Sequence, residues 1–342
     1  MSNSRITAQQ VAAAAGVSQS AVSRVFTPGA SASPRTVAKV QQAARELGYR
    51  PNSLARAMVS GKSRMIGLVV AYLQNQFYPD AMEKLSSQLQ EKGYHLLVFL
   101  AAQTDGDIDR VVSEILDYQV DGIIAASVAM SSDLSERCRQ IGVPLVLFNR
   151  SQDDPSLSSV TSDNRAGGRQ VAEFLLAGGH QRIAYIAGWE GASTQRDREA
   201  GFVAALQAAG QSLYARAVGN FKLEDAAAAT RQLFDVPAGE RPDAVFVAND
   251  HMAFKVMDVL RFELGLAVPE EVSVVGYDDV QAAGWQAYDL TTVRQPANQM
   301  VSETVRLLLA QIEGENTPPS QIEIGGPLVL RGSARIAKGW KR

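Results

Sequence analysis

Polar and charged side chains recur in this sequence directly after short apolar runs. A carboxylate can accept two hydroxyl hydrogen bonds, an amide can donate and accept, and a guanidinium donates, so together these groups suit a ligand with vicinal hydroxyls. Aromatic side chains can cover an apolar face of such a ligand. The polar candidates are Asn149, Arg150, Arg196, Asn249, Asp250, Asp278 and Asp279, and the aromatic ones are Phe77, Tyr78, Trp189 and Phe221.

The apolar runs that precede these polar groups alternate with helical patterns from residue 65 onward. Near-continuous apolar runs of this length predict parallel strands that are covered on both faces, and so many of them predict two α/β lobes. Ligands of such sheets bind beyond the carboxyl ends of the strands. The runs are IGLVVAY (66–72), HLLVFLA (95–101), DGIIAAS (121–127), VPLVLFN (143–149), RIAYIAG (182–188), DAVFVAN (243–249) and VSVVGYD (272–278).

Several of the polar candidates also have a purely structural interpretation. We expect Asp250 and Asp279 to cap helices rather than to bind a ligand, and Arg150 either contacts the ligand or pairs with a carboxylate between the lobes. The segment 156–168 has few apolar residues and is the expected crossover between the lobes.

The first 64 residues carry nine Lys or Arg and one acid, a net charge of +8, whereas the whole chain is −3. The remaining residues therefore sum to −11. A basic head suits a polyanion such as DNA, because clustered cations release the counterions condensed on its phosphates.

The head contains signals for three short helices. Thr7 and Ser18 are N-cap residues on either side of Gly16, and Ser33 precedes Pro34 at the start of a third helix. Two helices around a glycine turn have helix-turn-helix geometry, in which the second helix enters the major groove. There Arg24 can bind the O6 and N7 atoms of guanine. The other expected DNA contacts are Gln19 and Ser20 at base edges, Ser23 and Thr7 at phosphates, and Ser18 at the start of the second helix.

The head resembles the DNA-binding domain of the lactose-repressor family of bacterial regulators in the block AAAAGVSQSAVSRVF and in SPRTVAKVQQAARELGYRPNSLAR. The resemblance continues through VANDHMAFKVMDVL (247–260), VSVVGYDD (272–279), LTTVRQP (290–296) and LVLRGSAR (328–335), and so covers nearly the whole chain. It implies a ligand-responsive transcription regulator, most simply a repressor, whose effector is a sugar or sugar derivative. The implied partners are double-stranded operator DNA and a second copy of the chain.

The resemblance also assigns residues. It implies that NSLARAMVSG is a hinge helix that folds on DNA, with Met58 as the apolar wedge in the minor groove. Asn52 at the start of this helix, Ala55 and Arg56 are the other hinge contacts. For the effector, the family positions fall on Phe77, Tyr78, Asn149, Arg196, Phe221, Asn249, Asp278 and Gln295.

Three domains are expected, with boundaries partly set by the resemblance. They are a helix-turn-helix head at 1–50, a hinge and linker at 51–62, and an effector-binding and dimerisation body at 63–342. Within the body the first lobe should comprise about 63–163 and 294–322, and the second about 164–293 and 323–342.

Other classes of protein fit the residues less well. The sequence has no GxGxxG after a strand, no GxxxxGK[ST] and no GxSxG, and its three histidines lack metal-ligand spacing, so we expect neither an enzyme nor a cofactor. A sugar-binding transport protein would explain the body alone, but the basic head and the lack of an apolar signal core argue against it. The single cysteine agrees with a cytoplasmic location, on the nucleoid. A dimer is expected because one helix-turn-helix module buries little DNA surface.

Overall fold

The computed structural model describes residues 6–26, 30–50, 62–101, 105–128, 132–315 and 318–340. The chain divides into two compact units, Met1–Arg64 and Met65–Arg342, here called the head and the body. In the described part of the chain, no helix is both long enough and apolar enough to cross a membrane.

The head is a three-helix unit whose ends are set by local sequence. Its helices are α1 (Ala8–Ala15), α2 (Gln19–Val25) and α3 (Pro34–Leu47). Thr7, Ser18 and Ser33 each accept a backbone N–H bond at the start of a helix, and α1 ends at Gly16 with a φ of 65°. These helix starts confirm the sequence prediction. A small core holds the helices together around the fully buried side chains of Val11, Val22 and Val40.

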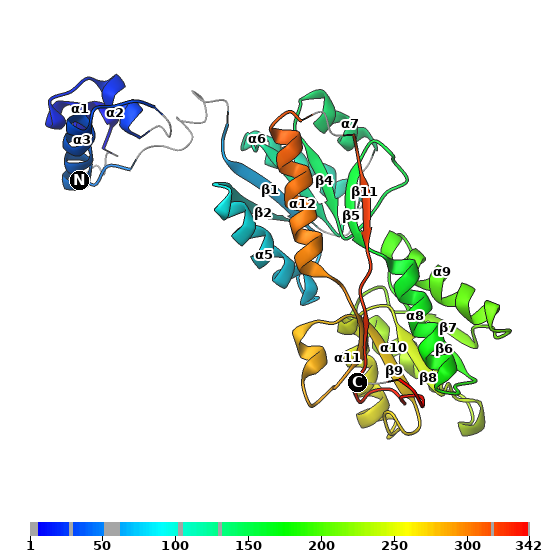
Figure 1. Ribbon diagram of the computed structural model, residues 1–342. Coiled ribbons are helices and arrows are strands. Elements are labelled where there is room, and N and C mark those ends of the chain that lie inside the picture. The colour runs from blue at the N-terminus through cyan, green and yellow to red at the C-terminus, as the bar shows by residue number, and fades with distance from the viewer. Residues whose placement is uncertain are drawn as a thin grey trace. The chain divides into compact units, whose positions relative to one another are not determined.

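The body contains two six-stranded sheets (Figure 1). The first sheet has the strand order β11-β5-β4-β3-β1-β2, and all of its pairs are parallel. Its strands are β1 (Met65–Val70), β2 (His95–Leu100), β3 (Gly122–Ala126), β4 (Leu145–Phe148), β5 (Ser158–Ser162) and β11 (Gln321–Ile324). We call this sheet and its helices the first lobe.

The second sheet has the order β12-β10-β9-β8-β6-β7, and only the pair of β10 with β12 is antiparallel. Its strands are β6 (Ile183–Ala187), β7 (Ala215–Val218), β8 (Ala244–Val247), β9 (Ser273–Asp278), β10 (Thr291–Arg294) and β12 (Leu328–Val329). This sheet and its helices form the second lobe. All seven apolar runs contain a strand, and the two-lobed parallel architecture is confirmed.

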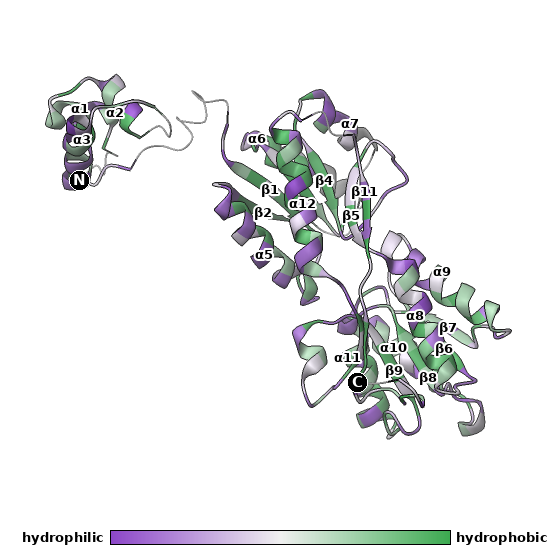
Figure 2. Cartoon of the chain, in the orientation of Figure 1, coloured by the Kyte–Doolittle hydropathy of each residue, from purple (hydrophilic) through white to green (hydrophobic). Residues whose placement is uncertain are grey.

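Helices cover the sheets, and their polar residues lie on the outer faces. Figure 2 shows hydrophobic residues concentrated in the strands and hydrophilic residues on the outer faces of the helices. The helices are α5 (Phe77–Glu91), α6 (Asp105–Asp117), α7 (Ser132–Gln140), α8 (Asn164–Ala177), α9 (Ser193–Ala208), α10 (Leu223–Phe234), α11 (Asp250–Asp258) and α12 (Ala297–Ile312). A π-helical turn, Val259–Glu263, continues α11, and short 3-10 turns lie at Ala238–Glu240 and Gln281–Gly284.

The chain crosses between the lobes three times: after β5, after β10 and after β11. The first crossing lies at Asp163, which caps α8. The segment 156–168, expected to be only a connection, therefore also contains β5 and the start of α8. Its polar residues hid the strand: Ser158, Ser159 and Thr161 are all buried.

Candidate functional site

A narrow polar pocket lies between the lobes, at the carboxyl ends of strands from both sheets. Parallel strands all end at the same edge of a sheet, so the side chains that follow β3, β4, β8 and β9 converge there. The free volume in the pocket is about 20 Å³, room for little more than a water molecule. The pocket is lined by Tyr72, Asn75, Tyr78, Ser127, Asn149, Arg150, Thr194, Arg198, Phe221, Asn249 and Asp278.

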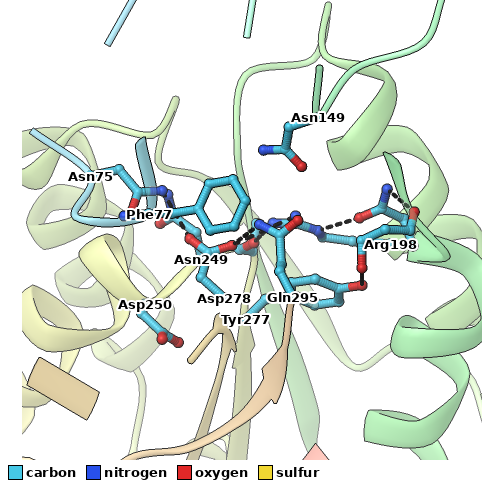
Figure 3. Close-up of polar contacts among 12 residues, drawn as sticks. Asn75, Phe77, Asn149, Arg198, Asn249, Asp250, Tyr277, Asp278 and Gln295 are labelled. Atoms are coloured by element: carbon cyan, nitrogen blue, oxygen red, sulfur yellow. Dashed lines mark hydrogen bonds and ion pairs between the residues drawn. The ribbon is translucent and has the colours of Figure 1, made fainter. Parts of the chain in front are cut away.

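Asp278, at the end of β9, is the centre of this pocket (Figure 3). Its carboxylate accepts hydrogen bonds from Asn75 Nδ2 at 2.8 Å and from Gln295 Nε2 at 2.6 Å. The guanidinium of Arg198 lies 3.7 Å away. Burial raises the pKa of Asp278, while Arg198 and the two amides lower it. Asn75 belongs to the first lobe and Asp278 to the second, so this cluster joins the lobes.

Arg198 is held rigidly from three sides. It donates to Asn164 Oδ1 at 2.9 Å and to the Ala248 carbonyl at 2.6 Å, and its guanidinium carbon lies 3.7 Å from the centre of the Tyr277 ring. An arginine fixed in this way presents a preorganised cation to the pocket.

The prediction for Arg196 is wrong, because Arg196 is exposed and does not line the pocket. Arg196 and Arg198 both lie in the first turns of α9. Residues two apart on a helix point about 200° apart, so when Arg198 faces the pocket Arg196 faces away from it.

Asn249 and Asp250 begin α11 and have different roles. Asn249 is the N-cap, accepting the Met252 N–H at 3.0 Å, and its side chain also lines the pocket. Asp250 is fully buried behind the pocket and accepts from the Thr292 hydroxyl at 2.6 Å and from the Val280 N–H at 3.0 Å. Burial and the nearby charge of Asp278 raise the pKa of Asp250 to about 8.

The expectation that Asp250 and Asp279 cap helices is wrong. Asn249 takes the capping role because it occupies the last non-helical position before α11. Asp279 instead forms ion pairs with Arg294 and Arg331, both at 2.6 Å, which tie the end of β9 to β10 and to the segment after β12.

Asn149 and Arg150 enter the pocket from the end of β4. Asn149 donates from Nδ2 to the Tyr78 hydroxyl at 3.0 Å, while no described residue donates a hydrogen bond to its buried Oδ1. Arg150 is 6% exposed and lies over the Trp189 ring at 5.3 Å. No ion pair to Arg150 occurs in the described residues, so the expected pairing with a carboxylate is not observed.

The predicted aromatic residues lie at two different cavities. Tyr78 and Phe221 line the polar pocket, where the Tyr72 hydroxyl donates to the Phe221 carbonyl at 2.6 Å across the two lobes. Phe77 instead stacks on Phe148 and, with Gln295, borders a second cavity of about 380 Å³ between α5 and the segment after β9. Gln295 reaches the polar pocket through its bond to Asp278.

Sequence reasoning missed several residues of the pocket. Tyr72, Asn75 and Ser127 follow β1 and β3, so the rule that identified Asn249 and Asp278 could have found them. Thr194 and Arg198 lie in α9, and only the helical period of that segment could have shown which of its residues face inward.

The predicted DNA contacts of the head lie on or beside α2. Gln19, Ser20 and Arg24 are exposed on this helix, as the second helix of a helix-turn-helix requires. Ser23 is exposed on the same helix, and the hydroxyls of Thr7 and Ser18 cap α1 and α2. The hinge contacts Asn52, Ala55, Arg56 and Met58 lie outside the described residues.

A helix-turn-helix head and a two-lobed body with a polar pocket between its sheets define a DNA-binding regulator that responds to a ligand. Residues 7–52 match the lacI family of bacterial regulatory proteins, and residues 172–334 match the periplasmic binding protein-like domain. The chain is 35% identical over 338 residues to the HTH-type transcriptional regulator CelR of Thermobifida fusca, covering 96% of this chain and 98% of that protein. It is 30% identical over 339 residues to the ribose operon repressor of Escherichia coli, with 96% and 99% covered.

Solved structures give the same result. The lac repressor dimer bound to operator and an anti-inducer matches with a TM-score of 0.87 and 28% identity, over 96% of this chain and 99% of that one. The complex of CelR with cellobiose matches with a TM-score of 0.73 and 33% identity, over 96% and 100%. The chain belongs to the lacI family and is a transcription regulator rather than an enzyme.

Proposed function

We propose that this chain is a dimeric repressor that binds a pseudo-palindromic operator and changes its DNA affinity when a sugar or sugar derivative enters the pocket between the lobes. The cluster of Asn75, Arg198 and Asp278 carries the proposal, because a carboxylate, a guanidinium and an amide converge where vicinal hydroxyls would need them. The printed descriptions of the relatives support it, since one names a cellobiose complex and another a ribose operon.

The proposed contacts to DNA come from the head and the hinge. Arg24, Gln19 and Ser20 contact base edges. The hydroxyls of Ser23 and Thr7 bind phosphates. We place the hinge at residues 51–62, between the head and the body, and propose that the protein acts in the cytoplasm on nucleoid DNA.

The coupling mechanism follows from the bonds that join the two lobes across the pocket. Asn75 of the first lobe donates to Asp278 of the second, and Tyr72 donates to the Phe221 carbonyl. A sugar that binds Asp278 replaces at least the first of these bonds, and the narrow pocket must widen to admit it. The lobes therefore change their separation on binding, which alters the hinges. A coupling of about 1–3 kcal/mol changes operator affinity roughly 5- to 150-fold.

The test is operator binding by the full-length protein, measured by fluorescence anisotropy with and without candidate sugars. Asp278→Asn should lose at least tenfold in sugar affinity, because the amide replaces two acceptor oxygens with one. Asp153→Asn, at an exposed carboxylate in the loop between β4 and β5, is the control for the loss of a carboxylate away from the pocket. A sugar that shifts operator binding equally in the wild type and in Asp278→Asn would remove this residue from the site.

A further inference from the structure

Arg150 is a buried cation without a counter-charge. Its side chain lines the pocket, its residue is 6% exposed, and no hydrogen bond or ion pair to it occurs in the described ranges. Its Nε atom in particular is buried without a partner. The guanidinium carbon lies 5.3 Å from the centre of the Trp189 ring, a cation–π contact that supplies neither a carboxylate nor a carbonyl acceptor for the N–H groups.

The charges that face the pocket do not balance. Two guanidinium groups, Arg150 and Arg198, line it with one carboxylate, Asp278. Asp278 already has Arg198, Asn75 and Gln295 as partners, so it does not neutralise Arg150. Burial lowers the pKa of Arg150, the Tyr78 hydroxyl raises it, and the positive charge of Arg198 lowers it further.

Asp250 does not restore the balance. It lies behind the pocket lining, bonded to Thr292 and to the Val280 N–H. Its pKa of about 8 keeps most of the carboxyl protonated, and therefore neutral, at pH 7. The pocket thus has one excess positive charge, and proteins rarely bury an arginine that has no partner.

We infer that the effector is an anionic sugar derivative, whose carboxylate or phosphate binds the edge of Arg150 while its hydroxyls bind Asp278 and Asn249. This inference rests on the proposed function and names the class of effector for the same pocket. Arginine binds carboxylate and phosphate through two parallel N–H bonds, and this geometry suits a planar group held against Trp189. The unpartnered Oδ1 of Asn149 next to it can accept a hydroxyl from the same ligand.

The first experiment measures binding of matched probes to the full-length protein by titration calorimetry. Within each set the sugar stays the same and only the charged group varies. The sets are glucose with glucuronate and glucose 6-phosphate, galactose with galacturonate and galactose 6-phosphate, and ribose with ribose 5-phosphate. A charged member that binds at least tenfold more tightly than its neutral counterpart supports the inference. The uronate and phosphate arms show which anion the site selects.

Neutral sugars that bind as tightly as their charged counterparts overturn the inference, and so does failure of every charged probe to bind. Tight binding of a neutral sugar alone would contradict the anionic effector but leave the proposed sugar-responsive function in place. Failure of this inference can therefore be distinguished from failure of the proposed function.

The second experiment replaces Arg150. Arg150→Met should weaken the charged probe at least tenfold more than it weakens the neutral counterpart. Arg196→Met removes an exposed arginine of α9 and should leave both affinities unchanged. Equal loss of the charged and neutral probes in Arg150→Met would overturn the inference, because it would indicate a role in shape rather than in charge.

A stability measurement without any sugar gives an independent readout. Arg150→Met should melt at or above the wild-type temperature, because it removes an unpaired buried charge and keeps an unbranched side chain. Arg198→Met should melt lower, because it leaves Asp278 without its ion-pair partner. If Arg150→Met lowers the melting temperature as much as Arg198→Met does, Arg150 has a structural role and the inference fails.

Discussion

The carboxyl group of Asp250 should make the stability of the body depend on pH. Asp250 is fully buried, and burial together with the charge of Asp278 raises its pKa to about 8. In the unfolded chain the same carboxyl titrates near 4. Between these two values the folded protein binds one more proton than the unfolded protein. The stabilising contribution of the protonated group is therefore complete below about pH 4 and is lost as the pH rises through about 8.

The size of the effect follows from this difference in bound protons. One extra proton in the folded state lowers the free energy of unfolding by about 1.4 kcal/mol per pH unit, or about 3 kcal/mol between pH 5 and pH 7. Asp250→Asn removes this dependence and keeps the local bonds. Its Oδ1 can accept the Val280 N–H, as Asp250 does, and its Nδ2 can donate to Thr292 Oγ1, which reverses the bond that the Thr292 hydroxyl donates to Asp250.

The assay is urea unfolding of the full-length protein at pH 5, 6, 7 and 8, for the wild type, Asp250→Asn and the exposed control Asp153→Asn. The stability of Asp250→Asn relative to the wild type should rise by about 3 kcal/mol from pH 5 to pH 7, while Asp153→Asn runs parallel to the wild type. Parallel profiles for Asp250→Asn and the wild type would refute the reasoning, because they would mean that Asp250 is already ionised in the folded protein.

Four further substitutions test the packing and the head. Gly168→Ala should destabilise the body by about 1–3 kcal/mol in the same urea assay, because its Cβ would lie 2.1 Å from the Arg198 carbonyl oxygen and force α8 and α9 apart. Gly239→Ala, with nothing within 4 Å, should change stability by less than about 0.5 kcal/mol, and equal losses would contradict the close packing. Thr7→Ala should cost the head about 1 kcal/mol by removing the cap of α1, seen as a lower melting temperature of the head in circular dichroism; an unchanged value would show that the cap is not needed. Arg24→Ala should reduce the preference for a selected operator over scrambled DNA by about 1–3 kcal/mol in anisotropy titrations, and unchanged preference would exclude it as a base contact.

Local sequence was sufficient to predict the head and the central strands. Helix starts depend on one side chain and its neighbouring N–H groups, so Thr7, Ser18 and Ser33 could be recognised without any tertiary information. The seven apolar runs could be recognised because strands covered on both faces need apolar residues throughout. The strand-end rule then located Asn249 and Asp278, since the residue after a buried parallel strand reaches the ligand edge of its sheet.

Only the tertiary structure could show which face of a helix or strand is buried and which residues pack against it. β5 carries buried serines and threonines that local polarity marks as surface, and its burial comes from neighbours at both edges. The choice between Arg196 and Arg198 depended on the rotation of α9 against α8, which is set by close glycine contacts between the two helices. The state of a charge likewise depends on its surroundings. Asp278 and Arg150 both follow buried strands, yet within the described residues Asp278 has three polar partners and Arg150 has no hydrogen bond or ion pair, because burial and pairing are set by residues distant in sequence.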